Sequence, residues 1–496
     1  MSATRDPLEL ARAALAGERA WLVGGAVRDR IRGAGAADLD IVLDGDPGTA
    51  ARALARASST PRASAFALSE EYGGWRVVAH GGAWQIDIER LRGDSLEEDL
   101  ALRDFTVNAI AEPLMAGRSE PSALIDPLGG VQDLERRRLR AAGPRAFLED
   151  PLRVLRLVRM AVELDLEPTS ETAREAAAHA AALREVSPER IFMELRRVLA
   201  SAHAVAGLGL MAQIGATDVV LPELQALRGV EQSRYHHRDV YGHTLEVLEQ
   251  TIALTDDPTG ASEQIGLVGE ASPALRALLA EPLADELTRS EALRWGALLH
   301  DIAKPATRQL VAAPGERVDR HVTFLGHDRL GAQLTQEILG RLRASGRLQA
   351  HVAALVRHHL RLGFLVNEPQ PLARRSVFAY LRACEPVEVD VTLLSVADRL
   401  ATRGARSEQA IAAHLRLAGR ILEDALRWHA EGAPAAQWRG DELARELDLA
   451  PGPRLGELLE ELAQASYAGE IVTRAQALEH ARRFLDGSDG PTIERP

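Results

Sequence analysis

The chain has 496 residues and a formal net charge of −13, which is enough length for three or four domains with sizeable cores. Its single cysteine, Cys384, excludes an intramolecular disulfide framework and suits a reducing cytoplasm, where we expect the protein. The sequence shows no signal peptide and no apolar run of about 18 residues, so we expect a soluble protein that does not associate with a membrane.

The first predicted elements are a strand over residues 21–23 and a short helix over residues 26–31. Gly24 and Gly25 lie between them, where they would let the backbone approach a phosphate group. Arg28 lies on the helix. This order of a strand, a glycine pair and an arginine indicates a nucleotide-binding turn.

Asp38 and Asp40 begin the second predicted strand. Because side chains alternate across a strand, both carboxylates project from one face, about 7 Å apart along the chain, and can share divalent cations. Two Mg²⁺ ions held in this way would activate an attacking 3′-hydroxyl and neutralise a leaving pyrophosphate. A lone Asp-x-Asp is more often a solvated strand end, but the preceding glycine pair and arginine favour the catalytic interpretation.

Several further motifs follow in a fixed order, and together with the first two they extend to about residue 240. The whole set resembles the tRNA nucleotidyltransferase and bacterial poly(A) polymerase family, the class II branch of the DNA polymerase β superfamily. This resemblance implies extension of RNA 3′ ends without a nucleic-acid template, from CTP and ATP, with Mg²⁺, and tRNA as the partner. It rests on LVGGAVRD, DLDIV, LRDFTVNAIA (102–111), IDPLGGVQDL (125–134), EDPLRVLRLVRM (149–160) and SPERIFMEL (187–195).

By the same resemblance, Arg103 and Asp104 would contact the sugar and the triphosphate, with Asn108 nearby. The family usually has a basic residue where this chain has Leu102. Asp87, in the alternating segment WQIDIERL, is placed where the superfamily has its third catalytic carboxylate. An exposed strand aspartate without a catalytic role is the alternative for Asp87.

The segment between Arg90 and Arg103 is short. Family members that add the complete C-C-A carry a flexible loop of about a dozen extra residues here, and enzymes that add only the two cytidines lack it. The resemblance therefore favours CC addition, with full CCA addition as the alternative.

Asp150, Arg153, Arg156 and Arg159 recur every three residues, so on a helix they would form a polar stripe opposite an apolar one. The carboxylate of Asp150 can accept from the amino group of cytosine or adenine, while Arg153 donates to the neighbouring ring nitrogen. Guanine and uracil would instead present a carbonyl to the carboxylate and an N–H to the arginine. A solvated helix face with an internal salt bridge is the alternative. The apolar stripe consists of Leu152, Leu155 and Val158.

Residues 136–159 contain eight arginines against Glu149 and Asp150. Because phosphate neutralisation dominates RNA affinity, this run predicts a local basic track beside the base-reading helix despite the negative net charge. After residue 160 the pattern is almost wholly helical, with interruptions at Pro188, Pro222 and a loop around residues 256–272.

A second group of candidate ligands follows: His243 in YGHTLEVL, His300 and Asp301 in LRWGALLHDIAKP, and Asp398 in LLSVADRLA. In order and context these residues resemble the HD superfamily of metal-dependent phosphohydrolases, and imidazole with carboxylate suits Mn²⁺, Mg²⁺ or Ni²⁺. Buried core histidines are the alternative. Residues that could extend the site to a second metal or a phosphate are His327, His358, His359 and Lys304.

We therefore expect an α+β chain with a small nucleotidyltransferase head containing a mixed sheet at 1–143, an all-α neck at 144–230, an HD domain at 231–410 and a helical tail at 411–496. The favoured function is tRNA nucleotidyl transfer with a possible phosphohydrolase in the HD domain. Two alternatives stay open: a poly(A) polymerase, and a regulatory HD hydrolase whose head only binds. The lack of a basic C-terminal extension disfavours the polymerase, and the complete head motifs disfavour the regulatory hydrolase.

Overall fold

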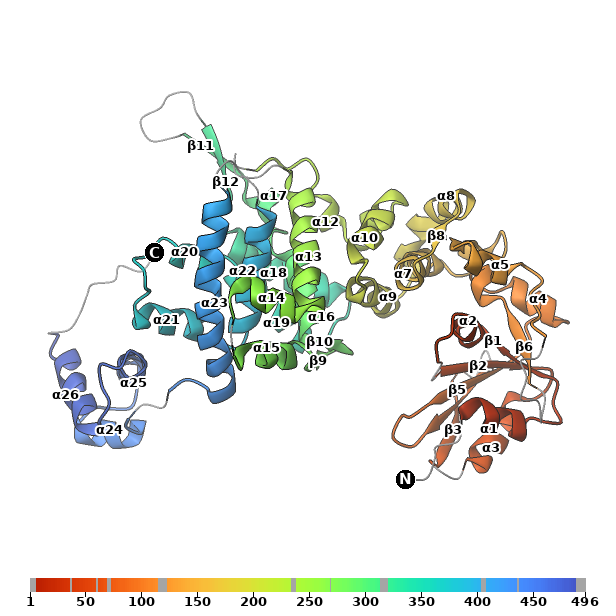
Figure 1. Cartoon of the computed structure of the whole chain (residues 1–496), viewed down its shortest axis with the longest axis horizontal. Coiled ribbons are helices and arrows are strands. Elements are labelled where there is room, and N and C mark those ends of the chain that lie inside the picture. Colours follow the sequence, from red (N-terminus) through yellow and green to blue (C-terminus); the bar gives the residue numbers. More distant parts are fainter. Residues whose placement is uncertain are drawn as a thin grey trace. The chain divides into compact units, whose positions relative to one another are not determined.

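The computed structural model divides into two compact units, residues 1–220 and 221–496, and each is described by itself (Figure 1). The structure describes residues 6–35, 38–58, 61–68, 73–114, 123–232, 238–267, 269–312, 320–402, 407–434 and 437–487.

The first unit is built on a six-stranded sheet with the strand order β3-β4-β5-β2-β1-β6. Strands β2 and β5 pair in parallel and the other neighbours pair antiparallel, which confirms the predicted mixed sheet. The predicted strand at 21–23, the second strand that begins with Asp38 and the helix at 26–31 are also confirmed. The strands are β1 (Ala20–Val23), β2 (Asp38–Leu43), β3 (Ala63–Ala67), β4 (Trp75–Ala79), β5 (Gln85–Arg90) and β6 (Ala111–Pro113).

Helices cover both faces of this sheet. On one face α1 (Pro7–Ala14) and α3 (Pro47–Ala57) pack side by side against alternate strand residues such as Ile41 and Ile86 (Figure 1). The opposite face carries Val42 and is covered by α4 (Leu96–Ala101). Because Asp38 and Asp40 share the alternation of Val42, both carboxylates lie on the α4 side of the sheet.

The glycine pair of IDPLGGVQDL begins a helix at a tightly packed turn. A Cβ atom on Gly130 would lie 2.1 Å from the carbonyl oxygen of Thr106, so no larger residue fits. Asp126 accepts hydrogen bonds from the backbone N–H groups of Gly130 and Val131, at 2.7 and 2.9 Å. This turn joins α5 (Gly130–Glu135) to the 3₁₀ helix η1 (Thr106–Asn108), which follows Arg103 and Asp104.

Short helices and two small strands complete the first unit. The apolar stripe of α7 is confirmed, since Leu155 and Val158 are fully buried. The prediction that Asp150 lies on this helix is wrong. Asp150 is extended (φ −142°, ψ 101°) because Pro151 disfavours helical geometry in the residue before it, and α7 begins at Arg153. The elements are α2 (Gly25–Ile31), α6 (Ala146–Glu149), α7 (Arg153–Leu164), α8 (Ser170–His179), η2 (Ala180–Glu185), α9 (Pro188–Ala200), α10 (Ala204–Gln213), α11 (Thr217–Val220), β7 (Arg138–Leu139) and β8 (Glu167–Pro168).

The second unit is mainly helical, as predicted. The expected loop over 256–272 is wrong, because α14 (Pro258–Ile265) forms within it, capped by Asp257 with proline in its first turn. The other helices up to residue 431 are α12 (Pro222–Gln225), α13 (Val240–Asp256), α15 (Ala271–Leu279), α16 (Arg289–Leu299), α17 (Lys304–Thr307), α18 (His327–Arg341), α19 (Gly346–His358), α20 (Arg361–Leu365), α21 (Arg374–Cys384), α22 (Glu388–Ala401) and α23 (Ser407–Glu431). Two hairpins lie among them, β9 (Pro282–Ala284) with β10 (Leu287–Thr288) and β11 (Gln309–Ala312) with β12 (Arg320–Thr323).

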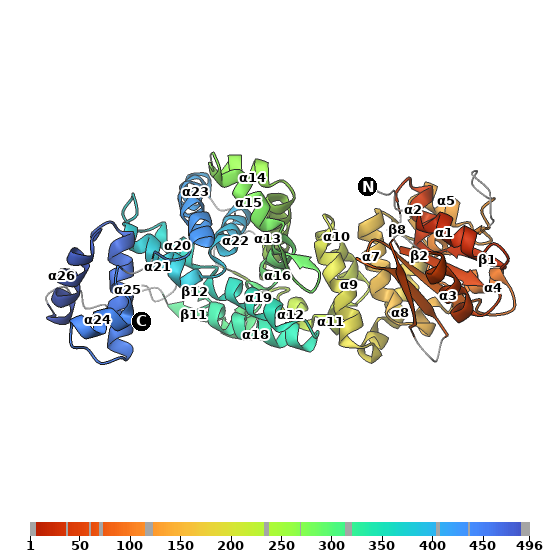
Figure 2. The same cartoon turned by 90° about the horizontal axis from the view of Figure 1, so that it is seen from below.

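Three helices at the end of the chain pack around a core of their own, which includes Leu458 and Leu462 (Figures 1 and 2). Arg375 of α21 pairs with Glu461 and Glu470 and so ties this group to the preceding helices. The helices are α24 (Gly440–Glu446), α25 (Pro453–Tyr467) and α26 (Arg474–Leu485). Of the described helices, none has the length and apolar character needed to cross a membrane.

Candidate active sites

Three carboxylates gather at one end of two neighbouring strands in the head. Asp40 of β2 is directly opposite Asp87 of β5 in the parallel register, and Asp38 precedes Asp40 on the same face. Solvent reaches Asp40, but the surrounding protein limits its hydration and raises its pKa to about 6; Arg103 opposes this shift and Asp87 adds to it. Acidic oxygens so placed on one face are the donor set that Mg²⁺ prefers.

The backbone at Gly24 borders this carboxylate cluster. Its φ is +72°, and a Cβ atom there would lie 3.1 Å from Oδ2 of Asp40 and 3.2 Å from Nη1 of Arg103. The left-handed φ therefore favours glycine, and a Cβ atom would require these two side chains to shift by a few tenths of an ångström. The guanidinium of Arg103 is in turn held by the buried Asp99, with N–O distances of 3.1 and 3.2 Å.

A hydrogen-bond network connects the glycine-turn helix to the neck. Arg28 donates to Oδ1 of Asn108 at 2.7 Å, and Asn108 donates to Oδ1 of Asp104 at 2.9 Å. Arg156 donates to Oδ2 of the same carboxylate. Burial alone would raise the pKa of Asp104, but Arg156 and the hydrogen bonds from Asn108 and Phe105 lower it to about 2. Asp104 therefore stays charged and fixes α7 against the motif that contains Arg103.

The two predicted base readers have other partners in this structure. Arg153 donates to the carbonyl oxygens of Leu102, Arg103 and Ala146, at 2.9, 3.3 and 3.2 Å. Asp150 pairs with Arg190 at 2.8 Å. The side chain of Arg153 is thus held in one orientation, and burial lowers its pKa although nearby acids oppose the shift.

The arginine run over residues 136–159 is not a continuous free track. Arg159 is buried and pairs with Glu194 at 2.6 Å and Glu163 at 2.8 Å. Arg140 pairs with Asp133 at 2.7 Å, and Arg137 pairs with Asp165. Much of this positive charge is therefore neutralised within the unit.

Partners that sequence reasoning missed support these groups. Arg76 of β4 forms a two-pronged ion pair with Asp87, with N–O distances of 2.7 and 2.8 Å. The strand register that places them opposite each other is not readable from the sequence. By contrast, the four-residue spacing of Asp99, on α4, and Arg103, two residues beyond its end, was a usable signal.

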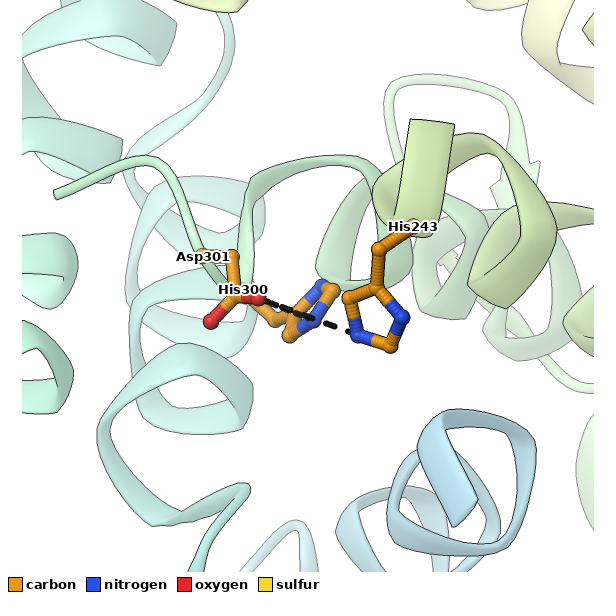
Figure 3. Close-up of side chains that lie close together, drawn as sticks. All are labelled: His243, His300 and Asp301. Carbon is orange, nitrogen blue, oxygen red and sulfur yellow. Dashed lines mark ion pairs between the residues drawn. The ribbon is translucent and has the colours of Figure 1, made fainter. Parts of the chain in front are cut away.

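The second unit brings its predicted ligands together. His243 comes from α13, whereas His300 and Asp301 lie at the end of α16, and their side chains converge in Figure 3. Nε2 of His243 lies 3.8 Å from Oδ2 of Asp301 and 3.0 Å from Oδ1 of Asp398. Nε2 of His300 lies 3.2 Å from Oδ2 of Asp301.

Asp301 is shared with a second cluster formed by two more histidines. Its Oδ1 lies 3.4 Å from Nε2 of His327 and 4.0 Å from Nε2 of His359. Within each group of three, the ligand atoms lie within 4.8 Å of one another. His358 does not join them, since its Nδ1 accepts from Arg361 at 2.8 Å. The described residues therefore offer two buried metal-ligand groups that share one carboxylate.

The imidazoles are oriented for metal binding. Nδ1 of His300, His327 and His359 lies 2.7–2.8 Å from the carbonyl oxygen three residues earlier. Because a carbonyl can only accept, Nδ1 carries a proton and Nε2 faces the cluster, where its lone pair is open to a cation when the ring is neutral. Nε2 of His300 makes no well-formed hydrogen bond within the described chain, which fits an atom that binds a cation.

Charges around Asp301 agree with this assignment. Burial would raise its pKa, but His300 and Lys304 hold it well below the usual range. Lys304 is buried and lies 2.6 Å from Oδ2 of Asp301, so it is part of this cluster and not an isolated surface lysine. Burial would also raise the pKa of Asp398, yet His243 holds it well below its usual range. The carboxylates stay ionised, as metal ligands require.

Comparisons with known proteins match three regions of the chain to known families. Residues 20–140 match the poly A polymerase head domain, residues 165–227 the probable RNA and SrmB-binding site of polymerase A, and residues 240–403 the HD domain.

Two relatives extend over almost the whole chain. The A-adding tRNA nucleotidyltransferase of Deinococcus radiodurans is 38% identical over 95% of this chain and 96% of its own. The CC-adding tRNA nucleotidyltransferase of Thermus thermophilus is 32% identical over 94% and 93%. A solved Thermotoga maritima CCA-adding enzyme complexed with tRNA shares the fold, with a TM-score of 0.60, 19% identity and 97% of each chain covered. The chain therefore belongs to the tRNA nucleotidyltransferase family and is a nucleotidyltransferase with an attached HD domain.

Proposed function

We propose that the head adds cytidine to tRNA 3′ ends and that its product ends in C-C. The observation that carries this proposal is the connection between β5, which ends at Arg90, and α4, which begins at Leu96. Four of the five residues in this connection are held by hydrogen bonds, which leaves little length free to reorganise the base pocket.

The ties are specific. Leu91 N–H donates to the carbonyl of Leu43 at 3.1 Å, and Arg92 N–H donates to Asp99 at 3.1 Å. Asp94 N–H donates to Glu98 at 2.8 Å, and Ser95 caps α4. A segment held in this way resembles the corresponding segment of the family members that lack the flexible loop and stop after two cytidines.

In this proposal Asp38, Asp40 and Asp87 would hold Mg²⁺, which supplies activation of the 3′-hydroxyl and neutralisation of pyrophosphate when bound. The backbone at Gly24 and Gly25, with Arg28 and Arg103, lies where the triphosphate would be cradled. With its pKa raised to about 6, Asp40 is mostly ionised at neutral pH and so available for a cation.

For base selection, the proposal gives Asp150 and Arg153 the amino edge of cytosine, with the partly exposed Arg156 and the buried Arg159 of α7 as support. Selection by Asp150 requires that its carboxylate turn from Arg190 to the base. The exposed guanidinium of Arg190 makes this exchange inexpensive, because solvent can replace the ion pair.

Addition of the terminal adenosine is the second candidate, and the 38% identity to the A-adding enzyme supports it. One experiment separates the two. Three tRNAs, ending at the discriminator base, after one cytidine and after two, are each incubated with Mg²⁺ and either CTP or ATP. CC addition predicts CTP use on the first two and no ATP use on the third; A addition predicts ATP use on the third alone.

We also propose that the second unit is a metal-dependent phosphohydrolase. Its ligands would be His243, His300, Asp301 and Asp398, with His327 and His359 for a second ion; Mn²⁺, Mg²⁺ and Ni²⁺ all suit them. A bound metal would supply an activated water for attack on phosphorus. Two assays, each with every metal in turn, test this activity: release of phosphate from nucleoside monophosphates, and ring opening of 2′,3′-cyclic nucleotides to nucleoside monophosphates.

A further inference from the structure

Asp99 is a buried carboxylate on α4 that binds two parts of the head at once. Its side chain is only 1% exposed. Oδ2 accepts from Nε and Nη2 of Arg103, at 3.2 and 3.1 Å. Oδ1 accepts from the backbone N–H of Arg92 at 3.1 Å. A single side chain therefore joins the connection between β5 and α4 to an arginine beside the carboxylate cluster.

The three nitrogen atoms of the Arg103 guanidinium have different surroundings. Asp99 occupies Nε and Nη2, whereas Nη1 makes no hydrogen bond within the described chain. A Cβ atom on Gly24 would lie 3.2 Å from this Nη1 and 3.1 Å from Oδ2 of Asp40, so both atoms border the glycine turn. The one guanidinium nitrogen that is left over thus lies where the turn would meet a phosphate chain.

The backbone of Arg103 is fixed from another direction. Its carbonyl oxygen accepts from Nη1 of Arg153 at 3.3 Å, and the carbonyl oxygen of Leu102 accepts from Nη2 of Arg153 at 2.9 Å. These bonds hold the peptide groups but not the guanidinium of Arg103. Because a long arginine side chain otherwise samples many rotamers, the direction of Nη1 depends on Asp99.

An ion pair that only stabilises the fold is the alternative role for Asp99, since a buried carboxylate needs a counter-charge. The residues around Arg103 favour a role in function. From Gly93 to Phe105 it is the only basic residue, because Leu102 stands where the family usually has another. No neighbouring side chain of this segment can replace a misdirected Arg103.

We propose that Asp99 is a positioning residue, which holds Arg103 so that Nη1 contacts the β- or γ-phosphate of the incoming nucleotide. The α-phosphate, where transfer takes place, belongs at the aspartates that would hold Mg²⁺, which leaves the outer phosphates to a guanidinium beside them. This assignment rests on the triphosphate contact proposed for Arg103. It does not depend on which base is added, since CTP and ATP share the triphosphate.

The test measures nucleotide binding by calorimetry, with the full chain and Mg²⁺ but without tRNA, so that no transfer occurs. Asp99→Ala weakens binding of CTP and ATP at least about tenfold and of CMP and AMP less than about twofold, because the monophosphates lack the outer phosphates. Arg103→Ala weakens CTP at least as much. In the Arg103→Ala background Asp99→Ala adds less than about twofold, because a positioning residue acts only through its target.

Glu98→Ala is the matched control for Asp99→Ala. Glu98 precedes Asp99 on α4 and accepts from the backbone N–H of Asp94 at 2.8 Å, so it holds the same connection without binding the guanidinium of Arg103. All four affinities should stay within about twofold in this variant, because the connection is loosened but Nη1 keeps its direction. Circular dichroism checks folding, and Asp99→Asn, which has nearly the same shape, replaces Asp99→Ala if that variant is unfolded.

Three results would each overturn the positioning role of Asp99: equal weakening of the tri- and monophosphates, an effect that persists in the Arg103→Ala background, or unchanged CTP and ATP affinity in a folded variant. The addition of cytidine is tested separately by incorporation into tRNA. If the protein adds adenosine and not cytidine, the proposed CC addition fails, while the comparison of ATP with AMP still decides the role of Asp99.

Discussion

Asp40 is accessible to solvent and lies beside a second carboxylate, that of Asp87. This placement predicts the effect of substituting Asp40. Asp40→Asn keeps the shape of the side chain but removes the charge that would hold Mg²⁺. We expect CTP incorporation into tRNA lacking its 3′ end to fall at least about a thousandfold, roughly 4 kcal/mol in the barrier, with tRNA binding retained.

Asp44→Asn is the matched control for Asp40→Asn. Asp44 lies just beyond the same strand and pairs only with the exposed Arg19, at 2.9 Å, so near-normal incorporation is expected. Incorporation by Asp40→Asn within tenfold of the control would contradict the metal assignment.

Asp150 is a cleaner probe of base selection than Arg153, because Arg153 also holds three backbone carbonyls. Asp150→Ala should lower the preference for CTP over UTP about tenfold or more, since the carboxylate that repels the O4 carbonyl of uracil is gone. Single-nucleotide incorporation with each labelled triphosphate measures this ratio.

The control for this change is Arg190→Ala, which frees Asp150 without removing it. CTP preference should persist in that variant. Unchanged preference in Asp150→Ala would show that the base is read elsewhere.

Side chains that act through a short sequence motif could be predicted, and their supporting partners could not. Asp38, Asp40 and Arg28 stand in one motif, and the structure brings Asp40 beside the predicted Asp87. Arg76 and Arg190 escaped prediction because they reach their partners through strand register and helix packing, over 11 and 40 residues of sequence.

At the level of elements, periodicity predicted the buried stripe of α7 but misplaced its beginning. The three-residue spacing continued through Asp150, yet Pro151 imposes an extended residue before it. The prediction of a loop over 256–272 was wrong for the opposite reason. The pair Asp257-Pro258 is typical of a turn, but it also begins a capped helix.

The junction between α7 and the Arg-Asp-Phe-Thr motif rests on Asp104, whose pKa falls from 3.8 to about 2 on folding. A carboxyl with a depressed pKa in the folded state stabilises that state above its unfolded pKa and loses this contribution as pH falls toward 2. Asp104→Asn should therefore destabilise the protein by about 2 kcal/mol between pH 5 and 8, with a shrinking difference below pH 4. Urea unfolding of both proteins across this range measures it.

A difference that stays constant down to pH 3 would mean that Asp104 acts through packing rather than charge. Asp165→Asn is a suitable control, because its ion pair with Arg137 is more than half exposed on both sides. That pair should contribute little at any pH.

Over the whole molecule, the succession of a mixed sheet and helical regions was predictable because each has its own period and its own motifs. The shared role of Asp301 was not, since two histidine clusters meet there only through the packing of α16, α18 and α19. The carboxylates of the head and the histidines of the second unit lie in different compact units, each with its own core.

This separation predicts that the two activities can be removed one at a time. His300→Ala with Asp301→Ala removes ligands from both histidine clusters and should abolish phosphate release, while CTP incorporation stays within about twofold of normal. Because metal ligands in a helical core also stabilise it, circular dichroism must show that the variant is folded. His358→Ala is the matched control, since this neighbouring imidazole pairs with Arg361 and not with the cluster. A folded double variant that loses CTP incorporation as completely as Asp40→Asn would mean that the second unit takes part in nucleotide addition, and the independence of the two centres would have to be abandoned.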